Sequence, residues 1–146
     1  MKIHQKKLLV FLIIWVIGIL IPMAWLAGQE PDVDAFFTAV FEPEWTHVVV
    51  HVFLYAVLGS LLAWIFKGKA RLWILIPFSV ILVGILQETM QVITLNRTPG
   101  RAELFDLCVD LLGALLGWLI FWLIAKFGKK EDFAAPAIEE VNKDEG

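Results

Sequence analysis

The sequence has a single cysteine, few charged residues and none of the short motifs that identify common enzyme classes. Because Cys108 has no second cysteine to pair with, no intramolecular disulfide stabilises the fold. The sequence contains no G-x-x-x-x-G-K-S/T loop, no G-x-G-x-x-G turn, no H-E-x-x-H and no C-x-x-C. These absences exclude the familiar nucleotide-binding loops, the zinc-protease helix and cysteine-based zinc clusters.

Apolar residues, in contrast, make up 60% of the 146 residues, and the mean hydropathy is +0.78. They lie in runs of about 20 residues, the length that a helix needs to cross a bilayer. We therefore predict one all-α domain, an integral membrane four-helix bundle over residues 1–127. Its spans are expected at about 8–27, 45–66, 72–95 and 104–127, and a charged, disordered cytoplasmic tail is expected at 128–146.

The first apolar run could also belong to a signal peptide, but it is longer than the usual 7–15 residues of such a segment. Trp25 also stands where a cleavage site would need a small residue. We therefore favour an uncleaved helix whose outer end is kinked by Pro22. Residues 35–41 form a short apolar piece that cannot span, and we place it in the membrane interface.

Basic residues occur in three clusters at alternate ends of the predicted spans. They are Lys2, Lys6 and Lys7, then Lys67, Lys69 and Arg71, and finally Lys126, Lys129 and Lys130. The positive-inside rule places these clusters in the cytoplasm, which gives an N-in/C-in orientation. Arg97 and Arg101 then lie outside, against the rule, which suggests a specific role. The expected partner is the lipid bilayer and no nucleic-acid partner is expected, since the basic residues flank spans and the net charge is only −3.

Polar side chains from three predicted spans converge at one membrane depth. Helical spacing places them on one stripe of each span: His47, His51 and Tyr55 on the second, Glu88 and Gln91 on the third, Asp106 and Asp110 on the fourth. The inner halves of the spans carry no such stripe. Ionisable residues within a membrane are costly and mark functional sites by default, so the stripe predicts an outward-facing site.

The first functional hypothesis is an enzyme or binding protein that acts on a lipid-linked or anionic substrate at the outer leaflet. Arg97 and Arg101 would hold a phosphate or carboxylate, together with Gln91 and Asp106. The catalytic residues would be Glu88 or Asp110 as general base, His51 as acid–base partner and Tyr55 as the residue that orients it.

Other interpretations of the same residues stay open. No organic cofactor is expected, but His47, His51, Glu88 and Asp110 form an alternative divalent-metal site, because His-x3-His puts two imidazoles on one helical face. In a structural interpretation, Asp106 caps the fourth span, Glu88 pairs with an arginine, and Gly113-x3-Gly117 is a close-packing motif. A non-catalytic scaffold is a further alternative, whereas the apolar inner halves argue against a transport pathway.

The order and spacing of these residues resemble the VanZ-like family of small bacterial membrane proteins, named after a teicoplanin-resistance protein. The resemblance covers about residues 45–125. The matching positions are His51-x3-Tyr55, Glu88-x2-Gln91 followed by Arg97, and Asp106-x3-Asp110-x2-Gly113-x3-Gly117. The sequence departs from the family pattern before the first histidine, where the family often has Asp-Lys and this chain has His47-Val48, and in a segment before Asp106 that is about three residues longer. Arg101 can therefore take the place of Arg97. The resemblance implies a bacterial inner or plasma membrane location, a cell-envelope role and a link to glycopeptide resistance, but no particular reaction.

Overall fold

The protein is all-helical over the residues that the computed structural model describes, which are 3–69 and 71–127, with side chains from residue 5. In chain order the helices are α1 (Ile3–Leu20), α2 (Met23–Ala27), α3 (Pro31–Phe41), α4 (Glu44–Ile65), α5 (Leu72–Thr94) and α6 (Arg101–Phe127). Three of them, α4, α5 and α6, are long and apolar enough to cross a membrane. Their bounds agree with the second, third and fourth predicted spans to within three residues. The tail predicted at 128–146 lies outside the described residues.

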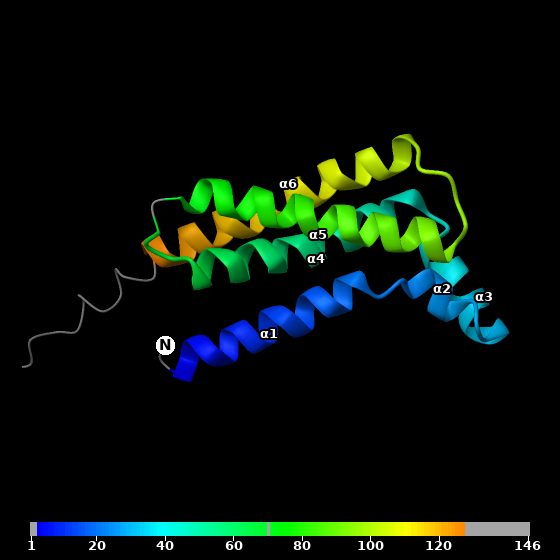
Figure 1. The fold of residues 1–146 in the computed structure, drawn as a ribbon, viewed down its shortest axis with the longest axis horizontal. Coiled ribbons are helices and arrows are strands. Elements are labelled where there is room, and N and C mark those ends of the chain that lie inside the picture. Colours follow the sequence, from blue (N-terminus) through cyan, green and yellow to red (C-terminus); the bar gives the residue numbers. More distant parts are fainter. Residues whose placement is uncertain (1–2, 70, 128–146) are drawn as a thin grey trace, which may run out of the picture.

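Helix α1 lies alongside this three-helix group, in contact with α4 and α5 (Figure 1). The indole of Trp15 in α1 donates a hydrogen bond from Nε1 to the backbone carbonyl of Leu54 in α4, at 3.0 Å. A polar contact between helices in apolar surroundings is favourable because its groups have few other partners there. The indole therefore fixes α1 against α4.

The first predicted span, residues 8–27, is divided into two helices by Pro22. Helix α1 ends at Leu20, and α2 begins at Met23 with Pro22 as its N-cap. Because proline lacks an N–H and its ring clashes with the preceding turn, a helix cannot continue regularly through this point. The predicted kink is thus a complete break.

Helix α3 is too short to cross a bilayer, as expected for the apolar piece at 35–41. It has 11 residues, starts at Pro31 and carries Asp32 and Asp34 in its first turn, where carboxylates are favoured by the helix dipole. It lies with α2 at one end of the molecule, before the start of α4, and exposes 72% of Phe36.

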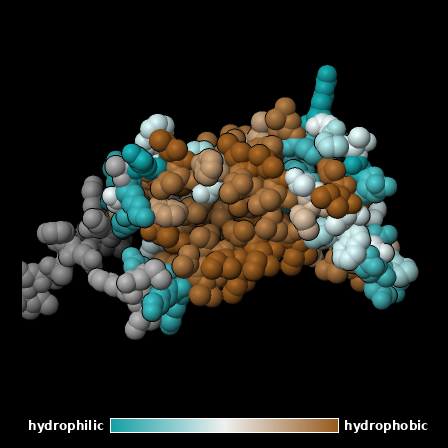
Figure 2. Space-filling view, in the orientation of Figure 1, coloured by the Kyte–Doolittle hydropathy of each residue, from teal (hydrophilic) through white to brown (hydrophobic). Residues whose placement is uncertain are grey.

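On the face shown in Figure 2, apolar residues form a broad belt over the long helices, and hydrophilic residues gather at both ends. The two ends differ in charge. The start of α1, the α4–α5 connection and the end of α6 share one end, and the first two of these carry Lys6, Lys7, Lys67, Lys69 and Arg71. Helices α2 and α3 and the α5–α6 connection share the other end, so the predicted charge asymmetry is present in the fold.

The buried interior is also divided along the bundle axis. Apolar side chains of α4 and α5 fill the basic end; the buried ones include Leu58, Leu62, Ala63, Ile76 and Val80. The buried polar side chains of the described chain lie towards the other end and are His51, Gln87, Glu88 and Asp110. The predicted concentration of polar groups at one end of the spans is confirmed.

Helices α4 and α6 approach each other closely because glycines line their contact. A Cβ added to Gly113 would lie 2.6 Å from the carbonyl oxygen of Val52, and one added to Gly117 would overlap the backbone of Ala56. On the facing side, Gly59 of α4 lies against the backbone of Ala114. Such contacts between small residues are the usual basis of tight helix packing in membranes. The prediction that Gly113-x3-Gly117 is a packing motif is confirmed.

Candidate functional site

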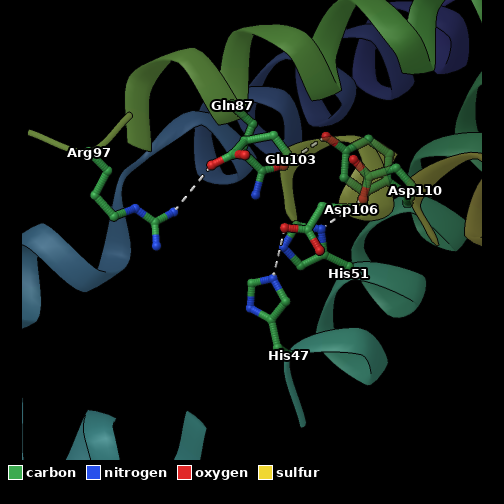
Figure 3. A network of polar contacts seen from close by, with 8 residues as sticks. His47, His51, Gln87, Arg97, Glu103, Asp106 and Asp110 are labelled. Atoms are coloured by element: carbon green, nitrogen blue, oxygen red, sulfur yellow. Dashed lines mark hydrogen bonds and ion pairs between the residues drawn. The ribbon is translucent and has the colours of Figure 1, made fainter. Parts of the chain in front are cut away.

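The central contact of the polar region joins α4 to α6 through a buried histidine and a buried aspartate. His51 Nδ1 lies 2.8 Å from Asp110 Oδ1, and the two residues are 3% and 0% exposed (Figure 3). An ionised Asp110 carboxylate can only accept, so with this partner a neutral His51 imidazole carries its proton on Nδ1. The Nε2 atom of His51 is thereby left with a lone pair.

A second histidine–aspartate pair lies one helical turn nearer the polar end of the bundle. His47 Nε2 is 3.3 Å from Asp106 Oδ2, with side chains 39% and 13% exposed. The rings of His47 and His51 lie with centroids 4.3 Å apart. The two pairs therefore form a short polar path from the polar end of the bundle to Asp110.

Tyr55 continues this path by one further turn of α4, but its hydroxyl does not meet the predicted partner. It donates a 2.7 Å hydrogen bond to Oε1 of Gln87 in α5, while its ring lies 6.4 Å from that of His51. The residue that holds His51 by a hydrogen bond is Asp110 and not Tyr55. The tyrosine instead fixes α5 to α4 directly beneath the histidines.

Gln87 is the site residue that the sequence analysis missed. It lies on the buried stripe of α5 together with Ile76, Val80 and Gly84, at intervals of three and four residues. That periodicity is the signal that identifies it. Gln91, which the sequence analysis chose instead, is one turn further along α5 and half-buried, and no side-chain hydrogen bond joins it to the described residues of the site.

Glu88 lies in the same polar region, where no hydrogen bond joins its side chain to the residues that the structure describes. It is 6% exposed, and its Oε1 atom has no partner within the described part of the chain. Its carboxyl group interacts electrostatically with Asp106, His51 and Asp110. Asp110 Oδ2 is not left without polar company, because the Tyr55 hydroxyl interacts with the Asp110 carboxyl group. An unpaired buried carboxylate oxygen such as Glu88 Oε1 is costly in apolar surroundings.

At the rim, the turn between α5 and α6 is organised by Glu103. Its Oε2 accepts a 2.6 Å hydrogen bond from the backbone N–H of Gly100, and its Oε1 lies 3.8 Å from Nη2 of Arg97 (Figure 3). Since α6 begins at Arg101, Glu103 occupies the third helical position, where a carboxylate typically caps the first turn. Asp106, one turn further on, is therefore not the cap, and the capping interpretation of this residue is wrong.

The arginines consequently lie outside the polar core. Arg97 has a 52% exposed side chain and pairs with Glu103, and Arg101 is exposed at the first turn of α6. Neither arginine forms an ion pair with Glu88 among the described residues, in contrast to the structural interpretation given above. The core itself therefore combines three carboxylates with two histidines and has no lysine or arginine partner in the described chain.

The structure thus gathers most of the predicted site residues and leaves three apart. Those that come together are His47, His51, Tyr55, Glu88, Asp106 and Asp110. Those at the rim or further along α5 are Gln91, Arg97 and Arg101. No protein-family model, no curated protein and no solved structure matches this chain.

Proposed function

We propose that this chain is a multi-pass protein of a bacterial cell membrane, with α1 as the fourth span and both termini in the cytoplasm. Support for the fourth span comes from the packing of α1 on α4 and α5 and from the Trp15 hydrogen bond. Support for the orientation comes from the lysine-rich end of the bundle, which the positive-inside rule assigns to the cytoplasm. The polar site then faces outward.

Labelling of single cysteines on intact cells tests this topology. In a Cys108→Ser background, Thr98→Cys in the α5–α6 connection should react with a membrane-impermeant maleimide on intact cells. Lys69→Cys, in the α4–α5 connection, is the matched control and should react only after lysis, because both positions are exposed loop residues and differ in the side of the membrane. If Lys69→Cys reacted on intact cells and Thr98→Cys did not, the opposite orientation would be correct.

The proposed activity is the binding and processing of an anionic, lipid-linked cell-envelope substrate at the outer leaflet. The observation that carries it is the buried His51–Asp110 pair, which reaches the polar end of the bundle through His47 and Asp106. A fixed imidazole with a free Nε2 beside an unpaired carboxylate is a suitable arrangement for proton transfer during hydrolysis or group transfer. In this proposal Glu88 is the general base, and Asp110 positions His51.

The rim residues give the site its proposed selectivity. Arg97 in the α5–α6 connection and Arg101 at the start of α6 offer guanidinium groups to a phosphate or carboxylate that approaches along the membrane surface. Helices α2 and α3 cover the same end with acidic and aromatic side chains. The resemblance to VanZ-like proteins makes a part in teicoplanin resistance the first phenotype to examine.

Glu88→Gln is the variant that tests the function directly. The amide has the same shape and removes the ability to accept a proton. Because Glu88 Oε1 has no hydrogen-bond partner in the described chain, the neutral side chain should not lower stability. We therefore expect normal membrane abundance and thermal stability of the purified variant, but loss of the teicoplanin resistance that the parent chain gives to a susceptible bacterial host.

Glu44→Gln is the control, since Glu44 is an exposed acid at the same end of α4 and outside the site. It should retain the resistance of the parent. Resistance equal to that of the parent in Glu88→Gln would remove Glu88 from the proposed chemistry. A parent chain without effect on teicoplanin susceptibility would refute the link to resistance.

A further inference from the structure

We propose that His47, His51 and Asp106 bind a divalent transition-metal ion of the zinc type at the polar end of α4 and α6. The proposal deepens the proposed function, because the ion would occupy the same outward-facing site. One nitrogen from each histidine and one oxygen from Asp106 all lie within 4.8 Å of one another. The chemistry of two imidazoles with one carboxylate is that of zinc sites with an open coordination position.

The distances between the candidate ligands fit a small ion. In tetrahedral coordination with bonds of about 2.0–2.1 Å, neighbouring ligand atoms are separated by about 3.3 Å. His47 Nε2 and Asp106 Oδ2 are 3.3 Å apart. The two histidines are one turn apart on α4, with their rings 4.3 Å apart, so both can reach one ion with small side-chain rotations. Three protein ligands leave a fourth position for water or substrate.

Asp110 provides the second observation, because it holds His51 as metal-bound histidines are usually held. A histidine that binds a metal commonly donates its other ring N–H to a carboxylate, which fixes the ring and increases its basicity. The 2.8 Å contact between His51 Nδ1 and Asp110 Oδ1 has this arrangement and leaves Nε2 for the ion. Asp110 is therefore assigned as a positioning residue and not as a ligand, which changes the metal set proposed from the sequence.

The third observation is the surplus of negative charge. Glu88 is buried to more than nine-tenths, has an unpartnered Oε1 within the described chain and interacts most strongly with Asp106. Arg97 does not neutralise this group, since it pairs with Glu103 at the rim. A divalent cation between the histidines and Asp106 would compensate the carboxylates in surroundings where unpaired charge is costly. It would also give an anionic substrate a positive partner inside an otherwise acidic site.

Metal titration of the full chain, purified in lipid nanodiscs and stripped with a chelator, tests the proposal. We expect about one equivalent of Zn²⁺ per chain, and Co²⁺ as a probe should give the intense visible absorption of a tetrahedral site. His47→Ala and Asp106→Asn should each weaken binding by about 100-fold or more, and Asp110→Asn by about 10- to 100-fold, as is usual for residues that orient a ligand. Glu44→Gln is the matched acidic control and should bind like the parent.

Less than about half an equivalent of Zn²⁺ in the folded parent chain would overturn the metal site, as would parent-like affinity in both His47→Ala and Asp106→Asn. Helix content and elution volume verify that each variant is folded, and the two independent ligand variants keep the test decisive if one fails to fold. Metal binding together with parent-like resistance in Glu88→Gln would retain the ion and reject Glu88 as the general base of the proposed function. Loss of resistance in Glu88→Gln, combined with no Zn²⁺ binding by the parent chain, would retain the proposed function and reject the metal site.

Discussion

Gly117→Leu should separate α4 from α6 and lower the stability of the bundle by about 3 kcal/mol, the upper end of the usual cost of overpacking. Even the first carbon of the new side chain would overlap the backbone of Ala56, which cannot move aside as a flexible side chain can. The same displacement would break the 2.9 Å hydrogen bond from Ser60 Oγ to the Gly117 carbonyl. The measurement is the unfolding midpoint in mixed micelles with increasing SDS, followed by helix content.

Gly18→Ala provides the matched control for this variant. Gly18 is also a helical glycine within an apolar segment, but a Cβ added there meets nothing within 4 Å. Alanine is also the better helix former by about 1 kcal/mol. We therefore expect an unchanged or higher midpoint for Gly18→Ala. Equal midpoints for Gly117→Leu and the parent would show that the α4–α6 contact does not limit stability.

Asp110→Ala should lower stability by about 1–3 kcal/mol, the usual cost of leaving a buried hydrogen-bond donor without an acceptor. The N–H of His51 would remain buried without an acceptor. Because Asp110 is 0% exposed, water cannot readily replace its carboxylate. Asp110→Asn keeps an oxygen that can accept from His51 Nδ1, and its loss should be about 1 kcal/mol. The same unfolding assay measures both variants.

The outer histidine–aspartate pair serves as the comparison for Asp110→Ala. His47 and Asp106 have the same chemistry one turn away, but the histidine side chain is 39% exposed. Exposed ion pairs are typically worth less than about 1 kcal/mol, so His47→Ala should change the midpoint little. If Asp110→Ala were as stable as His47→Ala, the buried pair would contribute little to the fold.

Much of the architecture follows from local sequence alone. A helix that crosses a bilayer must satisfy its own backbone hydrogen bonds and present apolar side chains over its length. The runs that became α4, α5 and α6 are therefore readable in isolation, as is the packing role of Gly113 and Gly117, whereas at Pro22 the sequence predicted a kink and the structure has a break. Helical periodicity also placed His51 and Asp110 on inward faces, because faces repeat every 3.6 residues whatever the neighbours are.

The choice of partner within the site depended on tertiary structure. Spacing along α4 shows that His51 faces inward, but the rotation and axial position of α6 decide whether it meets Asp110, Asp106 or Glu88. Those two parameters are set by the glycine contacts between α4 and α6. The placement of α5 against α4 likewise decides that Tyr55 meets Gln87 rather than His51. Because α6 begins at Arg101, Glu103 caps its first turn, and Asp106 pairs with His47. The sequence by itself determined which helices form and which faces they bury, whereas the distance and rotation between helices, a property of no single segment, decided which side chains touch.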